Sequence, residues 1–113
     1  MQTFQIALTT TGRKTGKPHE VTLYAYPDGD RLVVVGSYGG RPNDPDWAAN
    51  LRETSLVTVR QRGEEIEYRA KEVDGPDRER LWKLVTDAFP LYETYQGRTE
   101  RLIPLFVLEP VES

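Results

Sequence analysis

A cation-rich loop near the start of the chain carries residue types that suit an anion. Gly12 and Gly16 enclose Arg13, Lys14 and Thr15, and another lysine follows. Glycines let backbone N–H groups turn toward one point, threonine adds a hydroxyl donor, and the cations add positive charge. The whole chain has a formal net charge of -3, so this cluster runs against the composition. The loop therefore predicts an anion site, most naturally for phosphate, with a solvated basic turn as the alternative.

A second group of chemically useful side chains lies on an expected short helix. Trp47 and Asn50 are three residues apart, so a helix places them on one face. The Asn50 carboxamide offers a donor and an acceptor that suit the edge of a planar heteroaromatic ring. Trp47 either packs in the core or lines a pocket beside such a ring. Asp46 is placed to cap the helix, whose first N–H groups would then point toward Gly39 and Gly40.

Two tyrosines form a third candidate group. Tyr92 and Tyr95 are also three residues apart, in a polar and aromatic segment (residues 91–98) that follows Pro90. Two phenols on one face can line a pocket, stack on a ring or donate a proton, or they can cover the end of the fold without a chemical role. The sequence contains no Ser/His/Asp arrangement and no paired carboxylates suited to a pocket.

The composition restricts the classes of function. The length of 113 residues suits one domain with a single core, so residues 1–113 are taken as one domain. Cysteine is absent and His19 is the single histidine, which excludes disulfides, thiolate chemistry and a histidine-rich metal site. The acidic balance argues against nucleic-acid binding. The chain starts without a signal-peptide pattern and has no apolar run of roughly 18 residues, so we expect a cytoplasmic protein.

Apolar periodicity predicts the elements that position these groups. Strands are expected at residues 4–9, 21–26, 31–37, 55–61, 65–73 and 102–108, and helices at residues 47–53 and 77–89. Val33, Val34 and Val35 in succession indicate a strand covered on both faces. Parallel strands would need a crossover helix after nearly every strand, and two helices are too few. We therefore expect a mostly β (α+β) fold, a six-stranded antiparallel barrel with one short and one longer helix.

Four motifs in succession resemble the deazaflavin-dependent nitroreductase and quinone reductase family. They are Thr9-Thr10-Thr11-Gly12-Arg13-Lys14-Thr15-Gly16, Ser37-Tyr38-Gly39-Gly40, Pro45-x-Trp47-x-x-Asn50-Leu51, and Tyr92-x-x-Tyr95 with Ile103-Pro104. Their order and spacing agree from about Leu8 to Pro110. The resemblance implies a flavin-reductase-like split β-barrel that binds the 8-hydroxy-5-deazaflavin coenzyme F420. It also implies an oxidoreductase that passes a hydride from reduced F420 to a quinone, a nitroaromatic or an activated alkene.

The resemblance also assigns roles to individual residues. Lys14 and Thr15, with help from Arg13, would hold the phosphate of the coenzyme tail. Ser37 and the helix of Trp47 would border the ring, and the two tyrosines of the last motif would lie on its substrate side. The expected cofactor-binding residues are Arg13, Lys14, Thr15, Gly16, His19, Tyr24, Ser37, Tyr38, Gly39, Asp46, Trp47 and Asn50, and the expected catalytic residues are Tyr92 and Tyr95.

Two positions depart from the family pattern. His19 stands where close relatives carry an arginine, and Tyr38 stands where some carry a lysine. Both changes lower the positive charge around the coenzyme tail, so an FMN- or FAD-binding reductase of the same fold stays open as an alternative. A non-catalytic coenzyme carrier, and a barrel whose basic loop contacts acidic partners, are further alternatives.

The sequence also leads to expectations about the start of the chain, its partner and its assembly. Many members have a helix before the first strand, whereas this chain begins almost at that strand, so it is either a compact member or a trimmed one. The partner expected is a small electrophilic molecule, without nucleic acid or a transmembrane segment. A homodimer and a peripheral association with membranes are left open.

Overall fold

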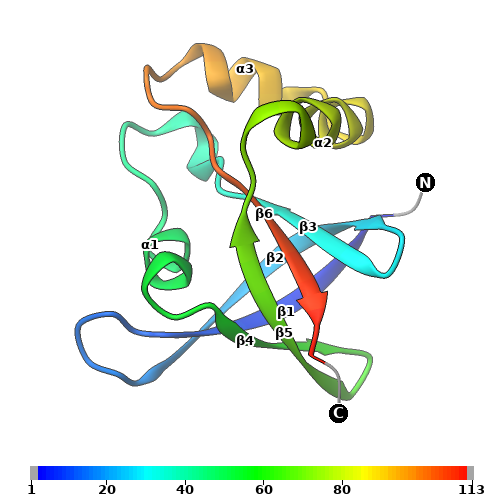
Figure 1. The fold of residues 1–113 in the computed structure, drawn as a ribbon. Coiled ribbons are helices and arrows are strands. Elements are labelled where there is room, and N and C mark those ends of the chain that lie inside the picture. The colour runs from blue at the N-terminus through cyan, green and yellow to red at the C-terminus, as the bar shows by residue number, and fades with distance from the viewer. Residues whose placement is uncertain (1–2, 112–113) are drawn as a thin grey trace.

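Six antiparallel strands close into a barrel in the computed structural model, which describes residues 3–111 (Figure 1). The strands are β1 (Phe4–Thr11), β2 (Pro18–Asp28), β3 (Arg31–Val35), β4 (Leu56–Gln61), β5 (Glu64–Glu72) and β6 (Leu105–Pro110). Their order around the barrel is β1-β2-β3-β6-β5-β4, and every neighbouring pair is antiparallel. Closure pairs both edges of each of these strands. The predicted six-stranded antiparallel barrel is therefore confirmed.

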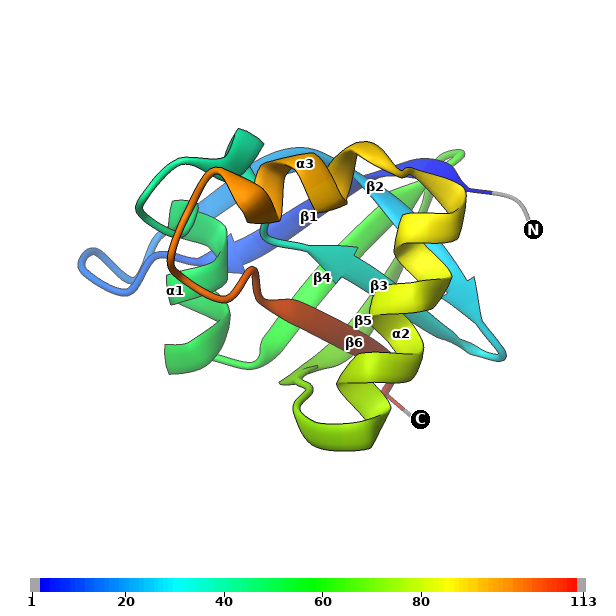
Figure 2. The same ribbon diagram turned by 90° about the horizontal axis from the view of Figure 1, so that it is seen from above.

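The helices cover the barrel unevenly. They are α1 (Asp46–Glu53), α2 (Gly75–Ala88) and α3 (Leu91–Gly97), together with a short 3-10 turn, η1 (Tyr38–Gly40). α2 and α3 form a layer over β3 and β6, while α1 lies at the side of the barrel, next to β1 and β5 (Figure 1, Figure 2). Among residues 3–111, none of the helices combines the length and the hydropathy that crossing a membrane requires.

Helix α3 was not among the predicted elements. Phe89 leaves helical backbone angles (φ -143°, ψ 86°) and ends α2, as expected from the following proline. Pro90 then has helical angles (φ -59°, ψ -21°) and stands at the N-cap position of α3. Proline tolerates the start of a helix because its missing N–H would have no partner there. The same residue thus separates two helices, and the prediction of only two helices is wrong.

The start of α1 also differs from the prediction. Pro45 (φ -66°, ψ 154°) occupies the N-cap position, and Asp46 is the first helical residue. No side-chain cap hydrogen bond forms, and the Asp46 carboxylate instead pairs with the Arg13 guanidinium at 3.3 Å. The prediction that Asp46 caps the helix is therefore wrong, although an acidic residue in the first turn still suits the helix dipole.

Two apolar cores lie on opposite faces of the barrel wall. Val34 of β3 belongs to the core inside the barrel, with Phe106. Val33 and Val35 belong to the second core, beneath α2 and α3, so the predicted covering of β3 on both faces is confirmed. Burying one such side chain contributes roughly 1.5–3 kcal/mol. The two cores therefore stabilise the barrel and hold the helix layer against it.

Candidate functional site

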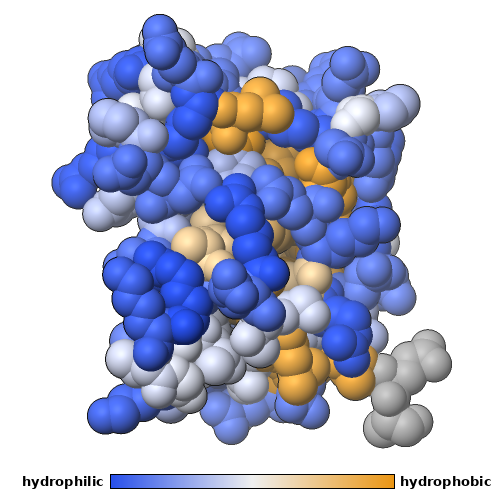
Figure 3. Space-filling model, turned by 60° about the vertical axis from the view of Figure 1, so that its left-hand side comes forward, coloured by the Kyte–Doolittle hydropathy of each residue, from blue (hydrophilic) through white to orange (hydrophobic). Residues whose placement is uncertain are grey.

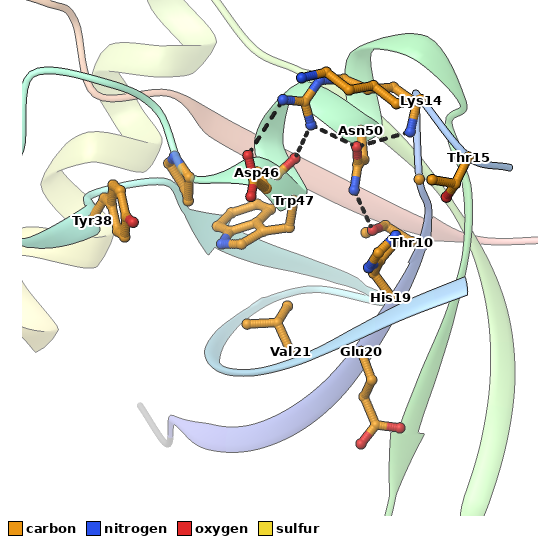
Figure 4. Close-up of a pocket in the computed structure, with 13 residues that line it drawn as sticks. Thr10, Lys14, Thr15, His19, Glu20, Val21, Tyr38, Asp46, Trp47 and Asn50 are labelled. Atoms are coloured by element: carbon orange, nitrogen blue, oxygen red, sulfur yellow. Dashed lines mark hydrogen bonds and ion pairs between the residues drawn. The ribbon is translucent and has the colours of Figure 1, made fainter. Parts of the chain in front are cut away.

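A pocket of about 440 Å³ lies between the tip of the β1–β2 hairpin and helix α1 (Figure 4). Its size is typical of small-molecule sites. Seen from the side of α1, the molecular surface is largely hydrophilic, with hydrophobic residues exposed in between (Figure 3). Eight of the twelve predicted cofactor-binding residues line the pocket: Arg13, Lys14, Thr15, His19, Tyr38, Asp46, Trp47 and Asn50.

The other four predicted cofactor-binding residues do not line this pocket. Gly16 lies at the exposed hairpin tip with a positive φ of 72°. Ser37 and Gly39 flank Tyr38 in the loop after β3. Tyr24 lies further along β2 with 55% of its surface exposed. The structure therefore brings the basic loop and the start of α1 together at the pocket, and these four predicted residues lie outside it.

Strand pairing places the basic loop at the hairpin tip. Thr10 of β1 pairs with His19 of β2, so residues 12–17 form the turn. A Cβ atom on Gly12 would lie 2.6 Å from His19 Nε2 and 2.8 Å from Thr15 Oγ1. Both atoms belong to exposed side chains, so a side chain at this position would make the His19 ring and the Thr15 hydroxyl shift. Gly12 therefore leaves room for the His19 imidazole and the Thr15 hydroxyl close to its backbone.

A buried carboxamide fixes the basic loop against α1. Asn50 is 3% exposed, and its Oδ1 accepts hydrogen bonds from Arg13 N at 3.1 Å and Arg13 Nη1 at 2.9 Å. Its Nδ2 donates to Thr10 Oγ1 at 3.1 Å. Arg13 also donates to the carbonyl oxygen of Asp46 at 3.3 Å. The amide keeps one N–H for a further acceptor, so the predicted contact of Asn50 with a ring edge stays a prediction.

The two walls of the pocket differ in character. Trp47 is buried and packs on Phe106 with ring centroids 5.9 Å apart, so it is both a core residue and a pocket wall. On the opposite wall Lys14 is exposed and forms no ion pair with any acidic side chain of residues 3–111. This arrangement suits a ligand with an anionic group and a planar apolar part. No cluster of side chains suited to a metal ion occurs in this described range.

Tyr92 and Tyr95 lie on α3 and do not line this pocket. Tyr92 is 7% exposed, and its hydroxyl lies 2.7 Å from the Tyr26 hydroxyl in the core beneath the helices. Burial, and then the hydrogen bond with Tyr26, raise the pKa of Tyr92, so its hydroxyl stays protonated at neutral pH. Tyr95 is half-buried, with its ring centroid 6.4 Å from that of Tyr92. A catalytic role for either phenol stays a prediction.

Sequence reasoning misses Thr10 and Tyr26, which anchor predicted residues. Thr10 continues the inward alternation of Ile6 and Leu8 and is buried, so a polar residue in an inward position was the available signal. Tyr26 ends an alternating pattern of a kind that many strands show, so the sequence gives no sign that this residue anchors another one. Its role depends on Tyr92, which is 66 residues away in the chain.

Comparisons with known proteins point to one family. A family profile described as F420H(2)-dependent quinone reductase matches residues 1–110. An F420H(2)-dependent quinone reductase of Mycobacterium tuberculosis is 38% identical over 106 residues, which cover 91% of this chain and 71% of that protein. A solved structure described as an F420-H2 dependent reductase (FDR-A) has 37% identity and a TM-score of 0.83, and the match covers 93% of both chains. It confirms the flavin-reductase-like split barrel.

A further solved structure, described as a domain-swapped dimer, has 37% identity and a TM-score of 0.84, with 93% of this chain and 79% of that chain covered. The profile spans nearly the whole chain, and the relatives exceed 30% identity over most of it. The chain therefore belongs to the F420H(2)-dependent quinone reductase family, a family of oxidoreductases that use coenzyme F420.

Proposed function

We propose that the protein passes a hydride from reduced coenzyme F420 to a quinone, with the coenzyme held between the basic loop and α1. The observation that carries this proposal is that Lys14 and Thr15 meet Trp47 in one pocket, in a chain of this family. One wall supplies a cation and a hydroxyl donor for a phosphate, and the other supplies an aromatic surface for a planar ring.

The residues present fit the coenzyme. At Gly12 the His19 ring and the Thr15 hydroxyl lie close to the backbone, and Lys14 lines the same pocket, so a hydroxyl and a cation are available to a phosphate. Asn50 holds the Arg13 guanidinium at the same wall. In this proposal the coenzyme tail is surrounded by Arg13, Lys14, Thr15, Gly16, His19 and Tyr38. The ring is bordered by Tyr24, Ser37, Gly39, Asp46, Trp47 and Asn50.

The chain's own residues orient the reactants and control access to protons. When bound, the reduced deazaflavin supplies a hydride from its C5 carbon. Trp47 excludes water from its side of the pocket, because it is buried against the barrel core. Tyr92 and Tyr95 shape the acceptor side in this proposal. Tyr92 is the first candidate for the proton donor in this proposal, with Tyr95 and solvent as the other sources. Burial raises the pKa of Tyr92 and so weakens it as an acid, which favours a role in shaping the acceptor side.

The proposal also covers the hydride acceptors, the oligomeric state and the location of the protein. Nitroaromatics and activated alkenes are included with quinones, since all three are electrophiles that accept a hydride. A homodimer is included because a similar chain is described as a domain-swapped dimer. A cytoplasmic location, with peripheral contact to membranes where lipid quinones lie, fits a chain without cysteine.

Anaerobic titration of the purified protein with reduced F420, FMN and FAD, followed by turnover with a soluble quinone, tests the proposal. We expect reduced F420 to bind more tightly than FMN and to be oxidised as the quinone is consumed. Turnover supported by FMN alone would identify a flavin reductase instead. Tight binding of F420 without turnover on any quinone, nitroaromatic or activated alkene would identify a carrier, and either result contradicts the proposal.

A further inference from the structure

Arg101, in the segment between α3 and β6, binds the backbone of the loop that follows β3. Its side chain is only 14% exposed. The N–H groups of its guanidinium donate to four acceptors of that loop: the carbonyl oxygens of Gly36 at 3.1 Å, Ser37 at 2.7 Å and Arg41 at 2.8 Å, and the Asp44 carboxylate at 2.8 Å. One guanidinium therefore spans the whole loop (residues 36–44).

This loop has a backbone conformation that needs external support. Tyr38, Gly39 and Gly40 have consecutive positive φ angles of 47°, 63° and 79°. Glycine adopts this region freely, whereas a tyrosine there is strained by on the order of 1 kcal/mol. Within the loop, the Gly40 N–H donates to the Ser37 carbonyl oxygen at 2.8 Å and the Arg41 N–H donates to the Tyr38 carbonyl oxygen at 3.1 Å. Strained backbone of this kind persists only where its surroundings determine it.

The conformation of the loop decides where the Tyr38 ring lies. The ring lines the pocket, and the Arg41 guanidinium lies 4.6 Å from its centroid. Arg101 is itself held in place by Gln96 of α3, whose Nε2 donates to the Arg101 carbonyl oxygen at 2.7 Å. Gln96 Oε1 also accepts from the Ile103 N–H at 2.9 Å. Hydrogen bonds thus connect α3, through Arg101, to the loop that carries Tyr38.

The same guanidinium also connects to α1. Asp44 accepts from Arg101 on one carboxylate oxygen and from Arg52 Nη1 on the other, at 2.7 Å. Arg52 lies in α1, the helix that carries Trp47 and Asn50. Arg101 is therefore placed to fix the loop and the helix relative to each other.

We propose that Arg101 is a positioning residue for coenzyme binding, which fixes the loop that presents Tyr38 to the pocket. The proposal rests on the proposed function, because it takes that pocket to be the coenzyme site. Arg101 does not line the pocket, so its effect passes through the loop and not through contact with the coenzyme.

The test compares the affinity for reduced F420 of wild type, Arg101→Gln and Arg101→Lys, with thermal unfolding measured on each protein. We expect Arg101→Gln to raise the Kd about tenfold, which corresponds to about 1.4 kcal/mol. Arg101→Lys keeps a charge opposite Asp44 but has three N–H donors on one nitrogen, too few for the four acceptors that Arg101 reaches from three nitrogens. It should therefore recover only part of the affinity, and it stands in if Arg101→Gln does not fold. Arg80→Gln is the matched control, since it breaks ion pairs with Asp28 and Asp77 away from the pocket and should leave the Kd unchanged.

A double-mutant cycle with Tyr38→Ala separates positioning from general stability. If Arg101 acts through Tyr38, Arg101→Gln should raise the Kd much less in the Tyr38→Ala background than in the wild-type background. Full additivity, or an unchanged Kd in folded Arg101→Gln and Arg101→Lys, would overturn the proposal. Wild-type protein that fails to bind reduced F420 would instead contradict the proposed function.

Discussion

Arg13 Nη1 lies 2.9 Å from Asn50 Oδ1, so a buried carboxamide of α1 fixes a cation of the hairpin loop. The backbone N–H of Arg13 donates to the same oxygen at 3.1 Å. Two segments that are 37 residues apart in the chain are thereby joined at the pocket. A loop held in this way keeps its shape without a ligand, which lowers the entropy lost on binding.

Asn50→Ala is expected to destabilise the protein. The substitution leaves Thr10 Oγ1 without its partner in a buried place and the Arg13 N–H without its partner in a partly buried one, which costs about 1–3 kcal/mol. Urea unfolding measures the change in free energy. Asn43→Ala is the matched control, because Asn43 is exposed and its replacement should change stability by no more than about 0.5 kcal/mol. Equal stability of the two variants would show that the Asn50 network contributes nothing.

Lys14→Ala is expected to weaken the binding of reduced F420 by about 1–3 kcal/mol, the usual loss for a charge-assisted contact with phosphate. The stability of the fold should hardly change, because Lys14 is exposed. Lys17→Ala should weaken binding less, since Lys17 does not line the pocket. Titrations of both variants with the coenzyme distinguish these outcomes. Wild-type affinity in Lys14→Ala would mean that the loop is only a solvated turn.

The barrel could be predicted because its strands carry a local signal. The alternation of Ile6 and Leu8 with more polar residues defines β1, and the three successive valines of β3 indicate its two covered faces. Helix α3 could not be predicted in the same way. Pro90 is compatible both with the end of one helix and with the start of the next, and the choice depends on the packing of Tyr92 beneath α3.

The site could be predicted in part, because motif similarity identifies residues but not their partners. The motifs place Arg13 and Asn50 in one site, yet they do not show that the two side chains bind each other. Arg101 binds the Ser37 carbonyl oxygen across 64 residues of chain. Every residue has a backbone carbonyl oxygen, whatever its side chain, so no pattern of residue types in the sequence can indicate this contact.

Stability is expected to fall in acid partly through Asp28. Hydrogen bonds from Arg80 and then Arg31 lower the pKa of Asp28 from 3.8 to about 2. Because the pKa is lower in the folded state, this stabilisation is complete above the ordinary carboxyl pKa and is lost as the pH falls from about 4 toward 2. Between pH 5 and pH 2 the free energy of unfolding should fall by about 1–2 kcal/mol more in wild type than in Asp28→Asn.

Urea unfolding at several pH values measures this difference. Arg80→Gln should show an intermediate profile, because it removes the first of the two arginine partners of Asp28 and leaves Arg31 in place. Parallel pH profiles for wild type and Asp28→Asn would show that the ion pairs do not shift the titration of this carboxyl group.

The buried pair of Tyr26 and Tyr92 is expected to behave as one unit in stability. Tyr92→Phe leaves the Tyr26 hydroxyl without its partner at 2.7 Å, and Tyr26→Phe does the reverse, so each should cost about 1–2 kcal/mol. The double variant removes both hydroxyls and should lose less than the sum of the single changes. Additive losses in urea unfolding would show that the two hydroxyls do not depend on each other.

The kinetics of Tyr92→Phe decide whether its phenol donates a proton or only shapes the acceptor side. Tyr92 is 7% exposed and outside the pocket between the hairpin tip and α1, so we expect a raised KM for a soluble quinone and a kcat within a few-fold of wild type. A phenol that donates the proton in the transition state would instead lower kcat by roughly 100-fold on substitution. Tyr95→Phe is the comparison, because Tyr95 lies beside Tyr92 on α3 but is only half-buried. Coenzyme affinity should stay at the wild-type value in both variants, and wild-type kinetics in Tyr92→Ala and Tyr95→Ala would exclude α3 from the active site.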